Sequence, residues 1–310
     1  MRIVSEPDLA RLLRGLTEDQ CHTLLSALVQ ALQTFSRQQA TAGASGPSFQ
    51  PPRSSITTDN GSTTLFMPSS NTATTGIKVV TVPRQGDIRG VINIFSPDGG
   101  LTGLLSAAEI TAFRTALASM ALLTRSNSIT KSRIAVFGAG KQAEWHARLI
   151  CLLFGKEVES ITLVNRSAGR LDRLCRQLSQ DIKESTAHVE VHQLTQEGRT
   201  EPQYREDLRA LIRDADEIDG QTLLSGGSKV YVDSREACLH ESGEIIKARV
   251  TGDRLIELGE CDPDQRSIAV PVGENVVFKC VGMGIMDLVI AQTLLDIAAA
   301  EGIGSVVEGF

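Results

Sequence analysis

A glycine-rich turn in the middle of the chain has the spacing of a phosphate-binding loop. Gly138, Gly140 and Ala143 stand in a G-x-G-x-x-A arrangement directly after the apolar run 133–137. The first glycine permits a tight turn, the second lets backbone approach a pyrophosphate, and the small third residue lets a helix pack on the strand. Amides at the start of that helix would face the phosphates. The turn predicts a dinucleotide site, although any tight strand-to-helix connection also favours glycine. Its residues would be Gly138, Ala139, Gly140, Lys141 and Gln142.

The residues at the end of the next apolar run are those that would distinguish NADPH from NADH. Residues 161–164 form the run, which ends in Asn165, Arg166 and Ser167, about where an acidic residue would hold the ribose of NAD. An arginine and a serine at this place favour a 2′-phosphate, which they meet by charge-assisted hydrogen bonds. These residues therefore predict NADPH rather than NADH as the cofactor. A solvated basic loop is the alternative.

Length and charge narrow the classes of function. A chain of 310 residues is longer than a single compact hydrophobic core accommodates, so we expect two domains. The net charge of -6, with lysines and arginines scattered, provides no basic face for nucleic acid and no polybasic patch for a membrane. Glu6 and Asp8 stand where a signal peptide would be basic, and no apolar run reaches membrane-spanning length. We therefore expect a soluble, cytoplasmic protein that binds neither nucleic acid nor membrane.

The thiols and the single His-Glu run suggest no metal centre. The 6 cysteines are widely spaced, without a C-x-x-C pair, and most stand in apolar surroundings. This pattern is typical of reduced core thiols. The run 240–244, which begins with His-Glu, lacks the second histidine of a zinc-binding helix.

Helical and strand patterns must position these residues. A capping box at Thr17 and Gln20 precedes a helix whose apolar residues reach Phe35, and a hairpin turn at 59–61 opens a strand-rich region. Apolar spacing then predicts a helix through 110–120 that leads into the nucleotide-binding domain. The expected strands of the strand-rich region are 53–56, 63–67, 77–82, 91–95 and 101–105.

The nucleotide-binding domain is expected to have a complete first half and a thin second half. The run 133–137 predicts a strand covered on both faces, because its residues are apolar without alternation. Helix, strand and helix then continue to about His192. The second half offers only a weak strand at 215–218 and clearer ones at 229–233 and 275–280. The last helix, 285–300, is apolar nearly all round and should be buried against the first domain.

Several segments together resemble a known family. They are residues 67–83, 111–119 and 137–146, with LGE and VGMGIMDL near the C-terminus. The family is that of ornithine cyclodeaminase and mu-crystallin, which also contains ketimine reductases and some alanine dehydrogenases. The resemblance implies an α/β fold, with a Rossmann dinucleotide-binding domain (128–280) and a discontinuous α+β domain (1–127 with 281–310). In the family the α+β domain binds substrate and pairs two subunits, which implies a homodimer active in amino acid metabolism.

The resemblance also implies roles for individual residues. Arg53 is similar to the family arginine on the substrate carboxylate, Lys78 to the lysine beside it, and Arg114 to a third cationic partner. An arginine and a lysine can hold the carboxylate of a small amino or imino acid at a fixed distance from the nicotinamide. Asn93 resembles a position that touches the cofactor, and Cys280 with Val281 resembles the small pair near the nicotinamide. The alternative for each cation is a plain surface residue.

Two departures from the family pattern shape the expected chemistry. Ornithine cyclodeaminases carry a glutamate three residues before the proline of the Met-Pro pair, and this chain has Leu65 there. The resemblance therefore argues against cyclodeamination and favours reduction of a preformed imine, which arrives already electrophilic. After Ile218 the chain also lacks several tens of residues of the family pattern, including a cofactor loop, which predicts impaired activity or an incomplete gene product.

Two classes of function therefore remain open. The first is an NADPH-dependent reductase of a small carboxylated imine, with ornithine cyclodeaminase as a further alternative. The second is a non-catalytic NADPH-binding protein like mu-crystallin. Neither the substrate nor the choice between linear and cyclic imines follows from these residues.

Overall fold

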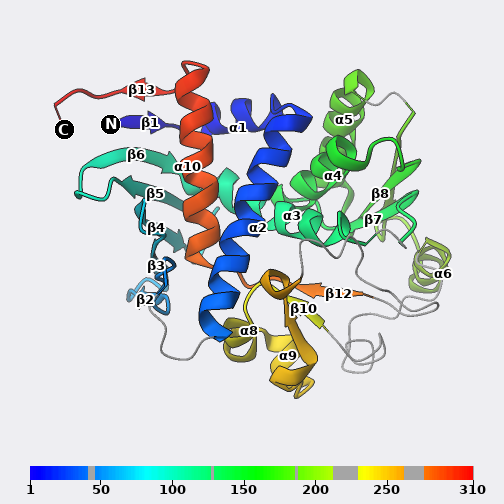
Figure 1. Cartoon of the computed structure of the whole chain (residues 1–310). Coiled ribbons are helices and arrows are strands. Elements are labelled where there is room, and N and C mark those ends of the chain that lie inside the picture. Colours follow the sequence, from blue (N-terminus) through cyan, green and yellow to red (C-terminus); the bar gives the residue numbers. More distant parts are fainter. Residues whose placement is uncertain (41–45, 127–128, 186–187, 212–229, 262–275, 310) are drawn as a thin grey trace.

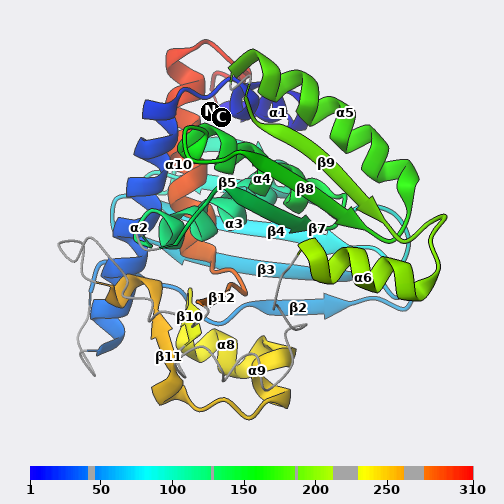
Figure 2. The same cartoon turned by 90° about the vertical axis from the view of Figure 1, so that its right-hand side faces the viewer.

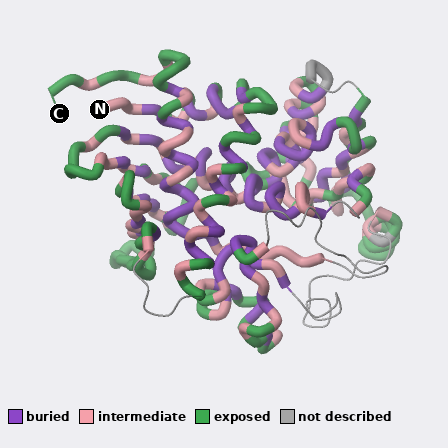
Figure 3. Tube along the Cα trace, in the orientation of Figure 1, coloured by how far each residue is buried: buried purple, intermediate pink, exposed green. Residues whose placement is uncertain are grey.

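The computed structural model describes residues 1–40, 46–126, 129–185, 188–211, 230–261 and 276–309. In these ranges a helical layer lies between a large sheet and two smaller sheets (Figure 1). Buried residues gather along the helical layer, whereas the exposed ones follow the outer loops and chain ends (Figure 3). None of the helices described is long and apolar enough to span a membrane.

The large sheet has seven strands in the order β13-β1-β6-β5-β4-β3-β2. Neighbours are antiparallel except β1 and β6, which are parallel. The predicted hairpin is confirmed, because β2 turns into β3 through Gly61 at φ 79°. The strands are β1 (Arg2–Val4), β2 (Ser54–Thr57), β3 (Thr63–Ser70), β4 (Thr75–Val82), β5 (Arg89–Phe95), β6 (Leu101–Ser106) and β13 (Ser305–Val306). All five predicted strands are present, and the two short terminal ones were not predicted.

Four helices form the layer on one face of this sheet, one of them packed on two of the others rather than on the strands (Figures 1 and 2). They are α1 (Glu6–Arg14), α2 (Glu18–Ala40), α3 (Ala107–Leu123) and α10 (Gly284–Ala300). The predicted capping box begins α2, since the amide of Gln20 donates to Thr17 Oγ1 at 3.2 Å and the amide of Thr17 to Gln20 Oε1 at 2.9 Å. As predicted, α10 is buried, because α2 and α3 pack beside it and strands β3 to β6 beneath it.

The other face of the sheet is apolar and carries none of the described helices. Alternation along β4 places Lys78 under the helices and Ile77 and Val79 on the opposite face. The register continues this face across the neighbouring strands. It is formed by half-buried or exposed side chains of Ile3, Phe66, Ile77, Val79, Val91 and Leu104.

The first half of the Rossmann fold is present as predicted. Three parallel strands lie in the order β7-β8-β9, and α4 and α5 follow β7 and β8. The expectation that the strand 133–137 is covered on both faces was wrong: burial alternates along β7, and Phe137 is 58% exposed. The elements are β7 (Arg133–Phe137), α4 (Lys141–Phe154), β8 (Ser160–Asn165), α5 (Ala168–Ser185), β9 (Glu190–Thr195) and α6 (Glu201–Leu211).

The second half forms a separate small sheet in the order β11-β10-β12, also parallel. Strands β10 and β12 confirm the predictions at 229–233 and 275–280. Within the described ranges β7 pairs only with β8, and the two small sheets are not paired with each other. The segment 215–218 and the join after Ile218 lie outside the described residues. The elements are β10 (Val230–Val232), α8 (Arg235–Glu241), α9 (Gly243–Lys247), β11 (Leu255–Glu257) and β12 (Val277–Lys279), with 3-10 turns η1 (Gly252–Arg254) and η2 (Leu258–Glu260).

One continuous core runs through the helical layer from the large sheet to α4 and α5. At the contact of α3 with α4, the rings of Phe113 and Trp145 meet edge to face with centroids 5.4 Å apart. This core crosses the boundary at residue 127 between the two expected domains. The division into residues 1–127 with 281–310 and residues 128–280 therefore remains a prediction.

Candidate functional site

The glycine turn has the geometry of a phosphate loop. Gly138 follows β7 with φ 107°, a left-handed conformation that favours glycine, and Gly140 is the N-cap of α4. A Cβ added at either glycine would meet no atom within 4 Å, so there is open space beside the backbone at both positions. The amide of Gly138 donates to the carbonyl of Val164 at 2.8 Å, which places this loop next to the end of β8.

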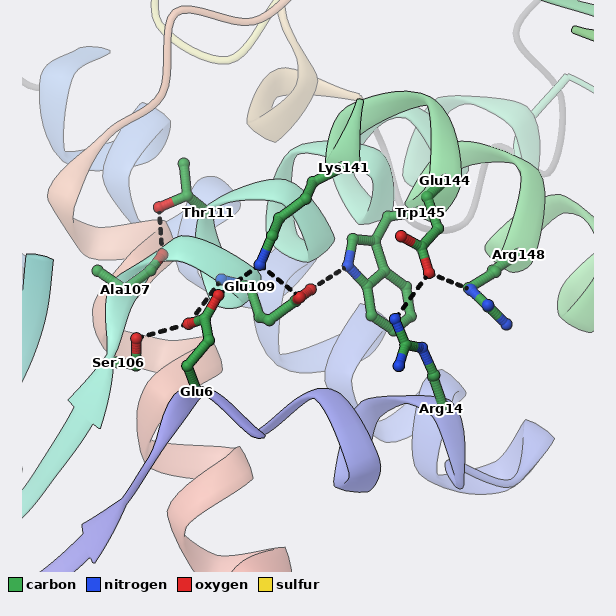
Figure 4. A network of polar contacts seen from close by, with 10 residues as sticks. All are labelled: Glu6, Arg14, Ser106, Ala107, Glu109, Thr111, Lys141, Glu144, Trp145 and Arg148. Atoms are coloured by element: carbon green, nitrogen blue, oxygen red, sulfur yellow. Dashed lines mark hydrogen bonds and ion pairs between the residues drawn. The ribbon is translucent and has the colours of Figure 1, made fainter. Parts of the chain in front are cut away.

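The Lys141 side chain is bound to protein carboxylates and is not free to contact a phosphate. Its ammonium group is hydrogen-bonded to Glu6 and lies 2.5 Å from Glu109 Oε1, and the other oxygen of Glu109 accepts from Trp145 Nε1 at 2.7 Å (Figure 4). Burial opposes the charge of Lys141, but the hydrogen bonds and charges of Glu109 and Glu6 raise its pKa overall. We infer that Lys141 ties the start of α4 to α3 and to the N-terminal segment. Only its main-chain amide then remains for a phosphate.

Asn165, Arg166 and Ser167 form the loop beside the glycine turn. The Asn165 side-chain amide donates to the carbonyl of Ser167 at 2.8 Å and so closes the loop. Arg166 is exposed and forms no ion pair with any residue that the structure describes. Its guanidinium group is therefore available for an anion at the carboxyl end of β8. Glu197 accepts from the Ala168 amide at 2.7 Å and caps α5 next to this loop.

Lys78 and Arg114 come together on a buried carboxylate that was not predicted from the sequence. Lys78 Nζ donates to Asp287 Oδ1 at 2.9 Å, and Arg114 Nε donates to the same oxygen at 3.3 Å. The side chains of Lys78, Arg114 and Asp287 are 3%, 6% and 1% exposed, so the whole cluster lies away from bulk water. The second oxygen, Asp287 Oδ2, has no hydrogen-bond partner among the residues that the structure describes. The three groups carry a net charge of about +1 when all are ionised.

The charges in this cluster shift one another's pKa values. Burial lowers the pKa of Lys78, and the charges of Arg114 and Arg53 lower it further, while Asp287 opposes the shift. Burial alone would raise the pKa of Asp287, but Arg114 and Lys78 lower it overall. Because Arg53 acts on Lys78, all three predicted cations belong to one electrostatic site. Such a site attracts an anion as small as a carboxylate.

Cys280 and Val281 belong to the turn that packs against Arg114. Arg114 Nη1 lies 3.8 Å from Cys280 Sγ, and a Cβ added at Gly282 would lie 2.4 Å from Arg114 Nη2. Gly282 has φ 88°, so glycine is required there both by conformation and by space. The fully buried Asp233 holds this turn by accepting from the amides of Gly282 at 2.7 Å and Val281 at 3.2 Å.

Arg53 lines a cavity that adjoins the buried pair. It forms an ion pair with Glu241 of α8, and both side chains remain about one-third exposed, at 34% and 30%. Arg53, Glu241, Met67 and Gly282 line a cavity of about 430 Å³. This volume is enough for a small amino or imino acid.

Asn93 is not brought together with the other predicted residues. In the register of β4 and β5, Lys78 faces Ile92 and Ile77 faces Asn93. Asn93 therefore projects on the open face of the sheet, opposite Lys78 and the helices. The role of Asn93 as a cofactor contact stays a prediction. The position of Asn93 within a single chain does not support that role.

Several residues of the site were missed by the sequence reading. Asp287 is an acidic residue in the first turn of a mostly apolar helix, and a charge among apolar neighbours is a usable signal for a buried partner. Asp233 directly follows the buried strand β10, which is a second such signal. Glu109 gives the same signal, because it is the only acidic residue of the largely apolar helix α3, whereas Glu241 shows no comparable pattern in the short polar helix α8.

The fold and the site define a class of protein: a mixed α/β protein with a Rossmann-type half and a cationic pocket on a separate sheet. The chain belongs to the ornithine cyclodeaminase/mu-crystallin family, whose model matches residues 16–197. It is 25% identical to the Delta(1)-pyrroline-2-carboxylate reductase of Bacillus cereus, over 90% of this chain and 92% of the relative. It is 26% identical to the ketimine reductase mu-crystallin of Mus musculus, over 66% of this chain and 67% of the relative.

A solved structure has the same overall fold. Thermococcus litoralis Delta(1)-pyrroline-2-carboxylate reductase, in complex with NADH and L-proline, superimposes with a TM-score of 0.77 at 21% identity. The match covers 99% of this chain and 100% of that chain. The predicted family and fold class are thereby confirmed.

Proposed function

We propose that the chain is an NADPH-dependent reductase of a small carboxylated imine. The observation that carries the proposal is the convergence of Lys78 and Arg114 on Asp287, with Arg53 lining the adjoining cavity. In this proposal Arg53 stays paired with Glu241 on the cavity wall, and Lys78 and Arg114 bind the substrate carboxylate, as a lysine and a bidentate arginine can. They thereby fix the orientation of the C=N bond, to which NADPH supplies a hydride. Relatives named pyrroline-2-carboxylate reductase and ketimine reductase support the same reaction class.

The residues of the glycine turn fit a dinucleotide. The open space beside Gly138 and Gly140 leaves room for a pyrophosphate on the main-chain amides at the start of α4. Ala139 and Gln142 would take part through their backbone. The alternative is a non-catalytic NADPH-binding protein, and the family includes mu-crystallin.

Cyclodeamination is the less favoured alternative. Leu65 lies on the same sheet face as Lys78 and packs against the core, so the place of the cyclodeaminase glutamate is apolar. Without that carboxylate no described group on this face offers a base beside Lys78 other than the ion-paired Asp287.

The deciding experiment mixes purified protein with NADPH and a panel of cyclic and linear carboxylated imines and follows the loss of NADPH absorbance. We expect turnover with at least one imine. Tight NADPH binding without turnover on the whole panel would favour the binding protein, and release of ammonia from ornithine would favour the cyclodeaminase. Very slow turnover would agree with the impaired activity expected from the short segment after Ile218.

We expect NADPH to bind at least about tenfold more tightly than NADH, which corresponds to about 1.4 kcal/mol from one charge-assisted contact. The contact is between the 2′-phosphate and Arg166, which is exposed and has no ion pair among the described residues. Fluorescence titration of both cofactors measures the ratio. Arg166→Ala should abolish the preference, while Arg170→Ala, an exposed arginine early in α5, should keep it. Equal affinities in the parent protein would contradict the assignment.

We also propose that two copies of the chain pair through the open face of the large sheet. That face gathers Phe66, Ile77, Val79 and Val91 with no described helix over it, and contiguous apolar patches of this kind mark interaction sites. A homodimer would bury them.

Light scattering coupled to gel filtration should therefore show a dimer. Val91→Glu places a charge on the face and should weaken dimerisation at least about tenfold. Ile246→Glu alters a residue of α9, 49% exposed and away from the sheet, and should leave the dimer intact. A monomeric parent protein, or a Val91→Glu variant that dimerises as well as the parent, would refute this interface.

A further inference from the structure

The cavity beside Arg53 has an acidic wall that the proposed reaction does not use. Glu236 and Glu241 of α8 both line it, and His240 lies between them. Met67 and Gly282 line the same cavity. Met67 is the cross-strand neighbour of Lys78, and Gly282 lies against the Arg114 guanidinium group. The cavity therefore adjoins the buried cations at one end and carboxylates of α8 at the other.

The positive and negative side chains around this cavity are not all paired with one another. At the buried end Lys78 and Arg114 share the carboxylate of Asp287, and the buried carboxylate of Asp233 also acts on Arg114. At the α8 end Glu241 is paired with Arg53, whereas Glu236 forms no ion pair with any residue that the structure describes. The α8 wall thus carries an excess of negative charge, and the His240 ring nitrogen Nδ1 is bound to the main-chain carbonyl of Glu236.

We propose that the α8 wall, through Glu241 and Glu236, makes the site selective for ligands with one carboxylate and rejects a second. The inference rests on the proposed function, because it takes this cavity as the place of the imine's side chain. A ligand that sets its α-carboxylate against Lys78 and Arg114 turns its side chain toward α8. A neutral side chain meets no charge penalty there, while a carboxylate approaches two like charges.

The Arg53–Glu241 ion pair adds to this selectivity. If Arg53 were unpaired, it would be free to receive a second carboxylate. Glu241 already occupies it, so a dicarboxylate must either displace Glu241 or remain beside it. Both alternatives weaken its binding relative to a neutral analogue of the same shape.

L-asparagine and L-aspartate provide a matched pair of probes, because they differ mainly in the charge of the side chain. L-proline serves as a third ligand with one carboxylate. Isothermal titration calorimetry on the full chain saturated with NADP⁺ gives each dissociation constant. We expect asparagine to bind at least about fivefold more tightly than aspartate, as two nearby like charges in a partly solvated site imply.

Two variants test the wall directly. Glu241→Gln should reduce the asparagine-to-aspartate ratio to about twofold or less, because it removes a charge and releases Arg53. Glu236→Gln should reduce the ratio by a smaller factor. Glu190→Gln removes one exposed charge from β9, away from the cavity, and should leave the ratio unchanged.

The outcomes separate this inference from the proposed function. If the parent protein binds none of the three ligands, the proposed function fails and the inference with it. If it binds them, but without preference for asparagine, or with the same preference in Glu241→Gln, only the acidic wall is refuted and the carboxylate site stands.

Discussion

Lys78→Ala protein should bind Delta(1)-pyrroline-2-carboxylate at least about 30-fold more weakly than the parent while keeping its affinity for NADPH. Lys78 is 3% exposed and shares Asp287 with Arg114, so its removal leaves a ligand carboxylate with one fewer partner in a site shielded from water. Leaving a buried charge short of a partner costs about 2–5 kcal/mol, which corresponds to about 30-fold or more. Titration of the variant with the imine and with NADPH measures both affinities.

The pH dependence of binding distinguishes a direct contact from a general loss of structure. Burial lowers the pKa of Lys78 below its ordinary value of 10.5, and the ligand needs the charged form. Affinity of the parent should therefore fall as pH rises through this lowered pKa. Lys78→Arg should keep its charge and shift that fall to higher pH. Lys247→Ala, a lysine of the short helix α9, serves as control. Parent-like imine binding by Lys78→Ala would refute the assignment.

Gly282→Ala should lower the rate of imine reduction about a hundredfold, since a displacement of about 1 Å at a reacting centre has effects of that order. A Cβ at this position would lie 2.4 Å from Arg114 Nη2, and the chain has φ 88° there. Arg114 is 5% exposed and cannot swing into water, so its guanidinium group must move within the site. Steady-state kinetics with the imine as the varied substrate measures the loss.

Repeating the Gly282→Ala substitution in an Arg114→Ala protein tests whether Gly282 acts through Arg114. In Arg114→Ala protein the space beside residue 282 is free, so adding Gly282→Ala should reduce the rate little further. Gly284→Ala is the matched control, because its added Cβ meets the main-chain oxygens of Met67 and Pro68 at 3.3 and 3.4 Å rather than Arg114. Additive losses in the double variant would show that Gly282 does not act through Arg114.

The sequence was informative wherever a feature depends on neighbours along the chain. The turn at Gly138 and the capping box at Thr17 are short-range patterns. The turn needs a residue that accepts a positive φ, and the capping box joins residues that are three positions apart. The strands and buried helices followed from periodicity for the same reason. The exposure of β7 was not predicted, because an apolar run does not show whether other elements cover both faces of the strand.

The direction of a side chain could not be predicted from such patterns. Lys141 stands in the phosphate-loop motif, yet its ammonium group is bound to Glu6 and Glu109, which are 135 and 32 residues away. A flexible lysine side chain takes the partner that packing brings within reach. The main chain of the loop was therefore predictable, and the end of its lysine side chain was not.

By itself, the sequence determined the Rossmann turn, which depends on residue types at fixed short spacings, and the family, whose resemblance pointed to the three cations. Only the tertiary structure decided which charges meet. Lys78 is joined to Asp287 across 209 residues, and Arg53 is paired with Glu241 of α8. The register of β4 and β5 also placed Asn93 on the opposite face from Lys78. A strand reverses its faces with a shift of one residue, so sequence spacing alone does not fix which side chains share a site.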